Sequence, residues 1–269
     1  MAEIKLIATD MDHTLLTEKG ELPPNTTDLI LDLHQLGIEF AIASGRPLYT
    51  LTHVFEETHQ QMTFIADNGA IIRYHGEIIF KSLLPIETYQ AIIHFIESET
   101  DGIAILCGLD TAIISEEQHQ HLDFLRTFYR HIQTTKDFST LAIDADKLTI
   151  YFPNENSKAY YDTVFKPKYC ADLSVTVGDT IWIDFMNKGI DKGSALRFLS
   201  HKLAVSADEM MAFGDTYNDV EMLKAVKYSY IVANASEDMR QYANFITKSN
   251  DDDGVSEIIR KVIKNNGHL

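Results

Sequence analysis

The residues most able to do chemistry are two aspartates near the start of the chain, Asp10 and Asp12. They follow a short apolar run that begins at Ile4, and such a run is typical of a strand buried in a parallel sheet. Ligands of open α/β sheets bind at the carboxyl ends of the strands, where these two side chains would lie. Two carboxylates so close together repel each other unless a cation or a shared proton relieves them. The alternative interpretation is an ordinary Asx turn.

Phosphoryl transfer is the chemistry that this pair suits. A phosphate monoester is a dianion and repels an approaching carboxylate. A carboxylate can attack it when Mg²⁺ bridges the two, and the aspartyl-phosphate that forms is labile to water. Asp10, at the strand end, is the candidate nucleophile. Asp12 is the candidate general acid/base, a role that needs a pKa raised towards neutrality by the neighbouring acid and by partial burial.

A phosphoryl group also needs donors and positive charge around it, and two later stretches offer them. Ser44 and Gly45 follow a second apolar run, so a hydroxyl and an exposed backbone N–H could hold the group, although Ser-Gly after a strand is usually just a turn. Lys192 is expected in the first turn of a helix capped by Asp191 or Ser194, where a bound anion would favour it. A solvated surface lysine is the alternative.

Further oxygen ligands follow the apolar strand expected at 210–213. Asp215 comes at the end of that strand, and Mg²⁺ prefers carboxylate oxygens. Asn218 and Asp219 could instead cap the helix expected at 219–226. Each of these stretches is a weak to moderate signal by itself. Their order, and their placement just after strands or at helix starts, make the set specific.

The composition is that of a globular protein and argues against some partners. The 269 residues carry a formal net charge of −17, which argues against nucleic acid or an acidic membrane face. An acidic protein that handles phosphate esters must concentrate positive charge locally, most simply with a metal ion. Cys107 and Cys170 are too few for a disulfide framework, and we find neither a signal sequence nor a membrane-spanning run. We expect a cytoplasmic protein; no oligomeric partner is evident.

The elements that must position these residues alternate between strand and helix. Strands are expected at 4–8, 38–43 and 63–66, with helices at 25–36 and 48–57 between them. The alternation resumes at Gly189, with helices at 192–203, 219–226 and 237–243, strands at 210–213 and 230–232, and a closing helix after Gly254. This pattern predicts an α/β fold with a doubly wound, mainly parallel, Rossmann-like sheet.

The stretch between these two parts has a different pattern. A β-hairpin is expected at 71–81, and an α+β module follows, with helices at 86–99, 117–132 and 157–165 and strands at 103–107, 112–115 and 148–152. A hairpin of strands 173–177 and 180–185 ends it. Its apolar face, expected in the core, carries Ile181, Ile183 and Phe185, and the opposite face carries Trp182, Asp184 and Met186. We therefore predict a core of residues 1–84 and 189–269 and an insert, residues 85–188, forming an α+β cap domain.

Taken together, these stretches resemble the haloacid dehalogenase-like hydrolase superfamily. Its first motif, Asp-x-Asp-x-Thr, is matched by Asp10-Met11-Asp12-His13-Thr14, and its second, third and fourth by Ser44, Lys192 and Gly214-Asp215-x-x-Asn218-Asp219. The resemblance implies that Asp10 is the nucleophile and a Mg²⁺ ligand, that Asp12 is the general acid/base and a ligand through its carbonyl, and that Asp215 completes the metal site. Asp219 would be a further ligand or an acid beside the metal. The phosphate would be held by the backbone of Met11 and by Ser44, Gly45, Lys192 and Asn218.

The place of the insert refines the resemblance. Only about thirty residues separate Asp12 from Ser44, too few for a cap domain. An insert between the third strand and Lys192 is similar to the superfamily class with a type II α+β cap (C2B), and the stretches 68–70, 189–193 and 247–255 resemble its Cof-type phosphatases. The resemblance implies Mg²⁺-dependent hydrolysis of a small phosphorylated metabolite, above all a sugar phosphate. A sugar phosphomutase with a related cap and a non-catalytic phosphometabolite-binding or signalling protein are the alternatives.

Overall fold

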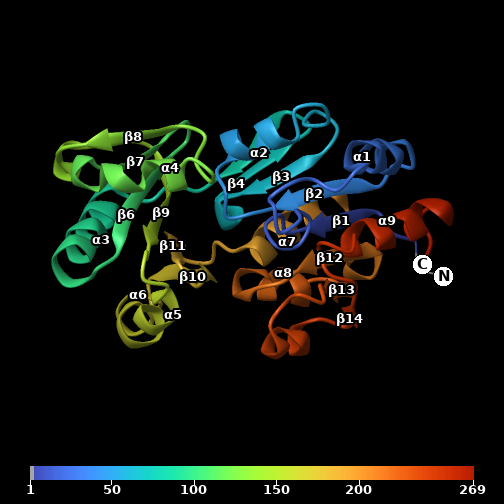
Figure 1. The fold of residues 1–269 in the computed structure, drawn as a ribbon. Helices are drawn as coiled ribbons and strands as arrows, with labels where there is room; N and C mark the ends of the chain where they lie inside the picture. Colours follow the sequence, from blue (N-terminus) through green and yellow to red (C-terminus); the bar gives the residue numbers. More distant parts are fainter. Residues whose placement is uncertain (1–2) are drawn as a thin grey trace.

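The computed structural model describes residues 3–269, which form two β-sheets on opposite sides of the molecule (Figure 1). The larger sheet consists of β1 (Leu6–Thr9), β2 (Glu39–Ala43), β3 (Thr63–Ala66), β4 (Ile71–Tyr74), β5 (Glu77–Lys81), β12 (Met210–Gly214), β13 (Tyr228–Ile231) and β14 (Phe245–Ile246). Their order across the sheet is β14-β13-β12-β1-β2-β3-β4-β5. Neighbours from β14 to β3 are parallel, and β4 and β5 add an antiparallel hairpin at one edge.

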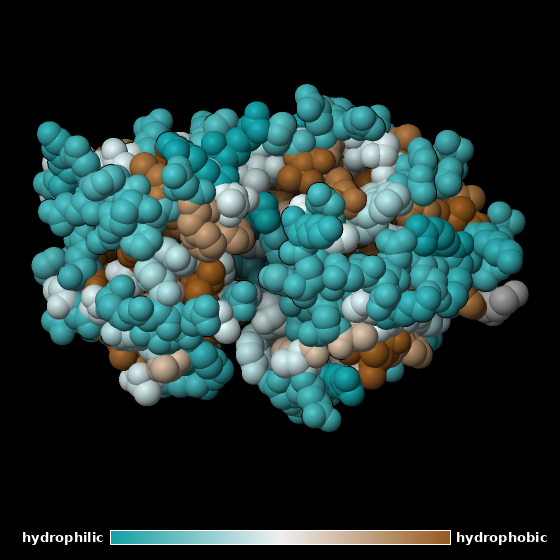
Figure 2. Space-filling model, viewed as in Figure 1, coloured by the Kyte–Doolittle hydropathy of each residue, from teal (hydrophilic) through white to brown (hydrophobic). Residues whose placement is uncertain are grey.

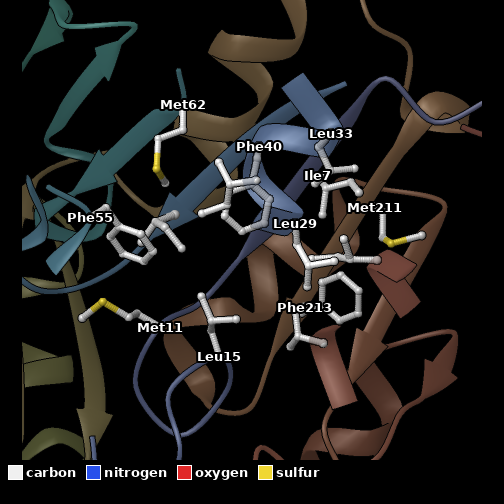
Figure 3. Close-up of a cluster of buried hydrophobic side chains, with 14 of the residues drawn as sticks. Ile7, Met11, Leu15, Leu29, Leu33, Phe40, Phe55, Met62, Met211 and Phe213 are labelled. Atoms are coloured by element: carbon white, nitrogen blue, oxygen red, sulfur yellow. The ribbon is translucent and has the colours of Figure 1, made fainter. Parts of the chain in front are cut away.

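Helices cover both faces of the larger sheet. α1 (Thr26–Gln35), α2 (Leu48–Val54) and α9 (Gly254–Lys264) pack on one face, and α7 (Lys192–Leu203) and α8 (Val220–Lys224) pack on the other. Strand side chains alternate between the two layers, so Ile7 belongs to the first and Leu6 to the second. Figure 3 shows the first layer, where Phe40 and Phe213 lie among side chains of α1. The doubly wound arrangement predicted from the sequence is confirmed, and it fixes the loops that follow the strands.

The smaller sheet lies within the insert. Its strands are β6 (Ile103–Gly108), β7 (Ala112–Ser115), β8 (Ile132–Thr135), β9 (Ala145–Tyr151), β10 (Leu173–Asp179) and β11 (Trp182–Asn187), in the order β10-β11-β9-β6-β7-β8. All neighbours are antiparallel except β7 and β8. α3 (Ile86–Glu99), α5 (Ser157–Tyr160) and α6 (Lys166–Tyr169) cover one face, where Ile183 and Phe185 are fully buried as predicted. Ile181, which precedes β11, is only partly buried and packs on the other face instead. Together with the larger sheet, this sheet confirms the predicted fold class.

The helix predicted over 117–132 is wrong. The chain instead forms a 3₁₀ helix (Glu116–His121), the one-turn helix α4 (Leu122–Leu125) and then β8. Leu125 and Tyr129, which a continuous helix would place on one face, pack on the second face of the smaller sheet. Pairing with β7 draws Ile132–Thr135 into the sheet, and that pairing is a contact that helical spacing cannot reveal.

Two other predicted helices are only partly regular. The stretch at 157–165 contains α5 followed by a π turn (Tyr161–Phe165), and the stretch at 237–243 is a 3₁₀ helix (Glu237–Tyr242). No helix within residues 3–269 combines the length and the apolar character needed to cross a membrane.

Candidate active site

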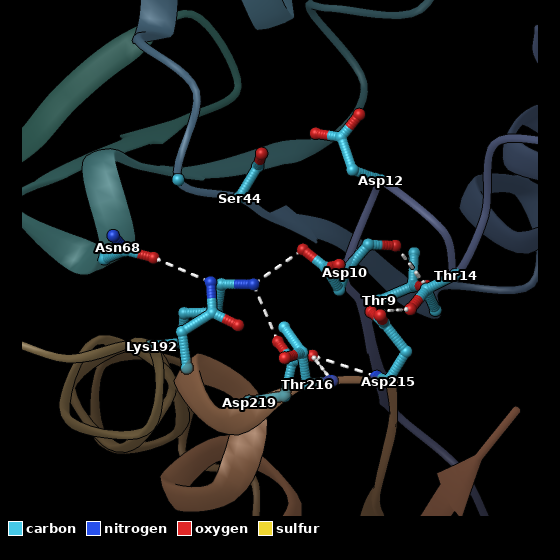
Figure 4. Close-up of polar contacts among 12 residues, drawn as sticks. Thr9, Asp10, Asp12, Thr14, Ser44, Asn68, Lys192, Asp215, Thr216 and Asp219 are labelled. Carbon is cyan, nitrogen blue, oxygen red and sulfur yellow. Dashed lines mark hydrogen bonds and ion pairs between the residues drawn. The ribbon is translucent and has the colours of Figure 1, made fainter. Parts of the chain in front are cut away.

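The predicted motifs meet at the carboxyl edge of the larger sheet. β1 lies between β12 and β2, and all three strands are parallel, so the residues that follow them lie side by side. Asp10 follows β1, Ser44 follows β2 and Asp215 follows β12, while Lys192 reaches the same place from the start of α7 (Figure 4). The topology thus brings together side chains from four distant parts of the chain.

Lys192 is completely buried and connects two of the acids. Its Nζ donates hydrogen bonds of 2.6 Å to Oδ1 of Asp10 and of 2.6 Å to Oδ1 of Asp219. The carboxylate of Asp191 caps α7 by accepting the Ser194 N–H, which places Lys192 in the first turn as predicted. Burial lowers the pKa of Lys192, but the carboxylates of Asp10 and Asp219 together raise it by more, so the net shift is upward. The surface-lysine interpretation is therefore wrong.

The other acids of this cluster are crowded and poorly hydrated. Burial raises the pKa of Asp10 well above its usual value, although Lys192 opposes the shift. Burial, with the nearby charge of Asp219, raises the pKa of Asp215 to about 7, while a hydrogen bond of 2.7 Å from Thr14 Oγ1 to Asp215 Oδ1 opposes it. These shifts mark a site where negative charge is in excess.

The donor set fits a divalent cation. Carboxylate oxygens of Asp10, Asp215 and Asp219 all lie within 4.8 Å of one another. Three carboxylates and the ammonium of Lys192 leave an excess of two negative charges when all are ionised. A Mg²⁺ ion would neutralise that excess and would find the oxygen ligands that it prefers.

Asp219 holds the loop after β12 in place. Its Oδ1 accepts from Lys192, and its Oδ2 accepts the N–H groups of Asp215 (3.0 Å) and Thr216 (3.2 Å). Gly214 makes room for it, because a Cβ at that glycine would lie 2.6 Å from the Asp219 Cβ. Both oxygens are thus already used, and the side chain is fully buried. That Asp219 also ligates the metal stays a prediction.

Asp12 is paired with Arg46, a residue to which we assigned no role from the sequence. Nε and Nη2 of Arg46 donate to the two Asp12 oxygens at 2.9 and 2.6 Å. The same guanidinium donates to the carbonyl of Thr127 in the insert at 3.0 Å and lies 5.1 Å from the centroid of the Phe128 ring. Both Asp12 oxygens therefore accept a hydrogen bond from Arg46 in this conformation. The sequence feature that could have identified Arg46 is its position directly after the Ser44-Gly45 of the second motif.

The residues predicted to hold phosphate surround Asp10. Ser44 is buried, and its Oγ accepts the Arg46 N–H at 3.1 Å. Asn218 donates from Nδ2 to Asn68 Oδ1 at 3.1 Å. The side chain of Met11 belongs to the hydrophobic core, so only its backbone is available to the site. Their roles as phosphate ligands stay predictions.

Gly45 lies at the boundary between the core and the insert. A Cβ at this position would lie 3.4 Å from Asn68 Oδ1 and 3.5 Å from Asp184 Oδ2, in ordinary van der Waals contact with both. Its carbonyl also accepts a hydrogen bond from the Lys147 ammonium.

Comparison with known proteins decides the family. The model of a family described as haloacid dehalogenase-like hydrolase matches residues 7–259. The chain belongs to this family. A 5-amino-6-(5-phospho-D-ribitylamino)uracil phosphatase of Escherichia coli strain K12 is 26% identical to it over 265 residues, which cover 97% of each chain.

Solved structures agree with this assignment. One from Streptococcus mutans superposes with a TM-score of 0.91 at 33% identity, covering 97% of this chain and 99% of that one. A haloacid dehalogenase subclass IIB sugar phosphatase superposes with a TM-score of 0.79 at 22% identity, covering 96% of this chain and 98% of that one, and shows the same fold. The prediction of a hydrolase among the phosphatases of this superfamily is confirmed.

The hydrolase carries a second buried charge cluster where the insert meets the core. Lys147 Nζ lies 3.3 Å from Asp67 Oδ1 and 3.6 Å from Asp184 Oδ1. Asp184 Oδ2 accepts from Asn68 Nδ2 at 2.6 Å, and its Oδ1 accepts from Thr149 Oγ1 at 2.5 Å. The sequence alone predicts for Asp184 only that it lies on the non-core face of its hairpin. Its partners lie far away in the sequence, so no local pattern could reveal them.

A cavity of about 570 Å³ lies between the core and the insert. Figure 2 shows the molecule hollowed between these two parts. Asp10, Asp12 and Asp215 line it from the core, and Phe128 and Trp182 line it from the insert. The volume is typical of a site that encloses a small molecule.

Proposed function

We propose that this hydrolase is a Mg²⁺-dependent phosphomonoesterase of small phosphate esters, sugar phosphates among them. The observation that supports it best is the convergence of Asp10, Asp215 and Asp219 within 4.8 Å, with the Lys192 ammonium between two of them. A site with this surplus of negative charge attracts a phosphate dianion only when a cation is bound.

Mg²⁺ would be held by the carboxylates of Asp10 and Asp215 and by the Asp12 carbonyl, and it would supply the charge that lets a carboxylate approach a phosphate dianion. A carboxylate oxygen of Asp10 attacks phosphorus, and the bond from phosphorus to the ester oxygen breaks as the new bond forms. Asp12 gives its proton to the departing alkoxide. It then takes a proton from the water that hydrolyses the aspartyl-phosphate, and phosphate leaves.

The other residues of the site position the reacting groups. Lys192 holds the Asp10 carboxylate through the hydrogen bond to Oδ1 and remains charged because its pKa is raised. Ser44, Asn218 and the backbone N–H groups of Met11 and Gly45 are suited to donate to the phosphoryl oxygens, as in an oxyanion hole.

The insert acts as a cap over this site. We take the cap to be residues 85–188 and the core to be residues 1–84 and 189–269. Arg46 hydrogen-bonds both Asp12 and the carbonyl of Thr127, so displacement of the cap would strain the contact between Arg46 and the acid/base. Separation of that ion pair frees Asp12 for proton transfer.

With its cysteines unpaired, the enzyme is suited to the reducing cytoplasm.

The test is a screen of phosphate monoesters for release of inorganic phosphate, with Mg²⁺ and with excess chelator. Release should require Mg²⁺, and Asp10→Asn should lower kcat by about four orders of magnitude or more. Asp28→Asn, which alters an exposed aspartate of α1, is the matched control and should leave kcat unchanged. Activity that persists in chelator would refute the metal, and substantial turnover by folded Asp10→Asn would refute the nucleophile. Transfer of phosphate to a second sugar hydroxyl, without release, would indicate a mutase.

A further inference from the structure

Asn68 lies beneath the candidate phosphate site, in the 3₁₀ turn Asp67–Gly69 that follows β3. Its backbone N–H donates to the Ser44 carbonyl at 2.9 Å, so the turn supports the loop that carries the second motif. Its side chain is buried and is not one of those that line the cavity. Asn68 can therefore act on a substrate only through its neighbours.

The two ends of the Asn68 amide contact different parts of the molecule. Nδ2 donates to Oδ2 of Asp184 in the cap at 2.6 Å. Oδ1 accepts from Nδ2 of Asn218 at 3.1 Å, on the side that faces the catalytic acids (Figure 4). Asn218 belongs to the loop after β12 and lines the cavity. Asp184, Asn68 and Asn218 thus form a chain of hydrogen bonds, the amide relay, from the cap to the candidate phosphate site.

The carboxylate of Asp184 sets the direction of the amide relay. An ionised carboxylate only accepts hydrogen bonds. Around Asp184, Thr149 Oγ1 donates to Oδ1 at 2.5 Å and Lys147 Nζ lies 3.6 Å from the same oxygen. Asn68 must therefore present its Nδ2 to the cap and its Oδ1 to Asn218. Asn218 must in turn present its Nδ2 to Asn68.

The resulting orientation of Asn218 has two consequences. Its Oδ1 is buried without a hydrogen-bond donor among residues 3–269, which is unfavourable for an amide left to itself. The second N–H of its Nδ2 can donate to a phosphoryl oxygen. The opposite orientation would place Oδ1 there instead, where it would repel both Asn68 Oδ1 and the phosphate dianion. The relay thus holds Asn218 as a donor.

We propose that Asn68 is a positioning residue for the phosphoryl group, because it orients the Asn218 donor only while Asp184 of the cap is docked against it. Without Asp184, nothing distinguishes the two ends of the Asn68 amide, and the orientation of Asn218 is lost. The cap therefore completes the phosphate site as well as covering it. This inference rests on the proposed phosphatase function and adds to it a dependence of phosphate binding on the cap.

The test exchanges the two groups that meet at the boundary. Asn68→Asp keeps an acceptor for Asn218 but removes the donor to Asp184. The backbone is kept, because Asp, like Asn, tolerates the φ of 54° at this position. Asp184→Asn alone should have little effect, since its amide can still present an oxygen to Asn68. With both substitutions, the carboxylate at position 68 accepts from the amide at position 184 and from Asn218, so the relay is restored.

Isothermal titration calorimetry with inorganic phosphate, in the presence of Mg²⁺, measures the outcome. Asn68→Asp should weaken phosphate binding roughly tenfold, the size of one lost hydrogen bond. The exchanged pair should recover most of that loss. For an ester that the enzyme hydrolyses, kcat/KM should fall and recover in the same order.

A charge-matched control separates orientation from electrostatic repulsion. Asp67→Asn combined with Asn68→Asp has the same net charge as the exchanged pair, but it leaves the carboxylate at position 68 facing Asp184. Its phosphate affinity should stay as low as that of Asn68→Asp. Recovery in this control, or no recovery in the exchanged pair, would overturn the relay and leave the phosphatase function standing.

A second variant keeps the proposal testable if Asn68→Asp does not fold. Asp184→Ala removes the acceptor of the relay and should weaken phosphate binding severalfold, although the loss of a negative charge alone would strengthen it. Asp172→Ala, which removes an exposed aspartate of the cap outside the cavity, should leave the affinity unchanged. Equal or tighter binding in Asp184→Ala would overturn the relay. If the wild-type protein neither binds phosphate with Mg²⁺ nor hydrolyses any ester, both proposals fail.

Discussion

Two buried clusters of this hydrolase have nearly the same composition, one lysine among aspartates, yet they differ in what they can hold. In the core, Lys192 lies between Asp10 and Asp219, and the oxygens of these acids converge with those of Asp215 within 4.8 Å. Where insert and core meet, Lys147 lies near Asp67 and Asp184. Its carboxylates do not form such a convergent group in the part of the chain that the structure describes. Convergence of oxygens, rather than charge alone, distinguishes a candidate metal site from an ion-pair cluster.

The surplus charge is also relieved differently in the two clusters. In the core a divalent cation would neutralise it. At the boundary, burial raises the pKa of both Asp67 and Asp146, and neither Asp146 oxygen meets a hydrogen-bond donor among residues 3–269. A proton shared between these two carboxyl groups would supply the missing donor. The first cluster is therefore suited to a cation and the second to a proton.

The largest expected effect comes from removing each lysine in turn. Lys192→Met should lower kcat by about three orders of magnitude or more, because Asp10 loses the hydrogen bond that positions it. Lys147→Met should lower the free energy of unfolding by about 3 kcal/mol, because it leaves the buried acids of the boundary without their counter-charge. It should lower kcat only roughly tenfold, because Lys147 touches no reacting group. Phosphate release and urea unfolding measure both effects. Equal losses of kcat would abolish the distinction between the clusters.

The pH dependence of metal binding sharpens the comparison further. The pKa of Asp215 is about 7 in the folded metal-free protein and near 3.8 when unfolded, so the native state holds the proton more tightly and stability falls as pH rises from about 4 to about 7. Mg²⁺ competes with that proton. Saturating Mg²⁺ should therefore raise the Tm by several degrees more near pH 8 than near pH 5.

Thermal unfolding with and without Mg²⁺ at both pH values checks this expectation. Asp215→Asn is the control, and its Mg²⁺-dependent shift should be small at both pH values. A shift in the wild-type protein that is independent of pH, or larger near pH 5, would contradict the assignment.

A smaller effect is expected at the boundary. Asp146→Asn replaces a group whose ionised form is disfavoured by burial, and an amide N–H can donate to Asp67 as the shared proton would. Because the raised pKa of Asp146 weakens the wild-type fold as pH rises, the variant should gain stability relative to wild type at higher pH, by about 1 kcal/mol near pH 8. Urea unfolding at two pH values, without Mg²⁺, tests this. A loss of stability that grows with pH would show that Asp146 is held as an ion.

Much of the site could be predicted because the relevant signals are local. Asp10, Ser44 and Asp215 each follow an apolar run, and parallel strands place the residues after them at one edge. Lys192 could be placed because Asp191 marks the start of its helix. None of these inferences needs a contact distant in sequence.

What could not be predicted depends on contacts between the insert and the core. Asp184 is 116 residues from Asn68, and Arg46 is 81 residues from Thr127, so no spacing rule connects them. The wrong helix at 117–132 also depends on contacts distant in sequence, but these lie within the insert. Leu125 and Tyr129 have helical spacing, but they pack into the buried cluster on the second face of the smaller sheet.

The most direct test of the central claim is whether Asp10 itself becomes phosphorylated. A phosphate-labelled ester that the enzyme hydrolyses would be mixed with it in Mg²⁺, quenched rapidly in acid, and the protein digested and mapped by mass spectrometry. We predict a labile phosphoryl group on the peptide that contains Asp10, absent in chelator and in Asp10→Asn. A label on another residue, or turnover with no labelled protein at any quench time, would contradict the account.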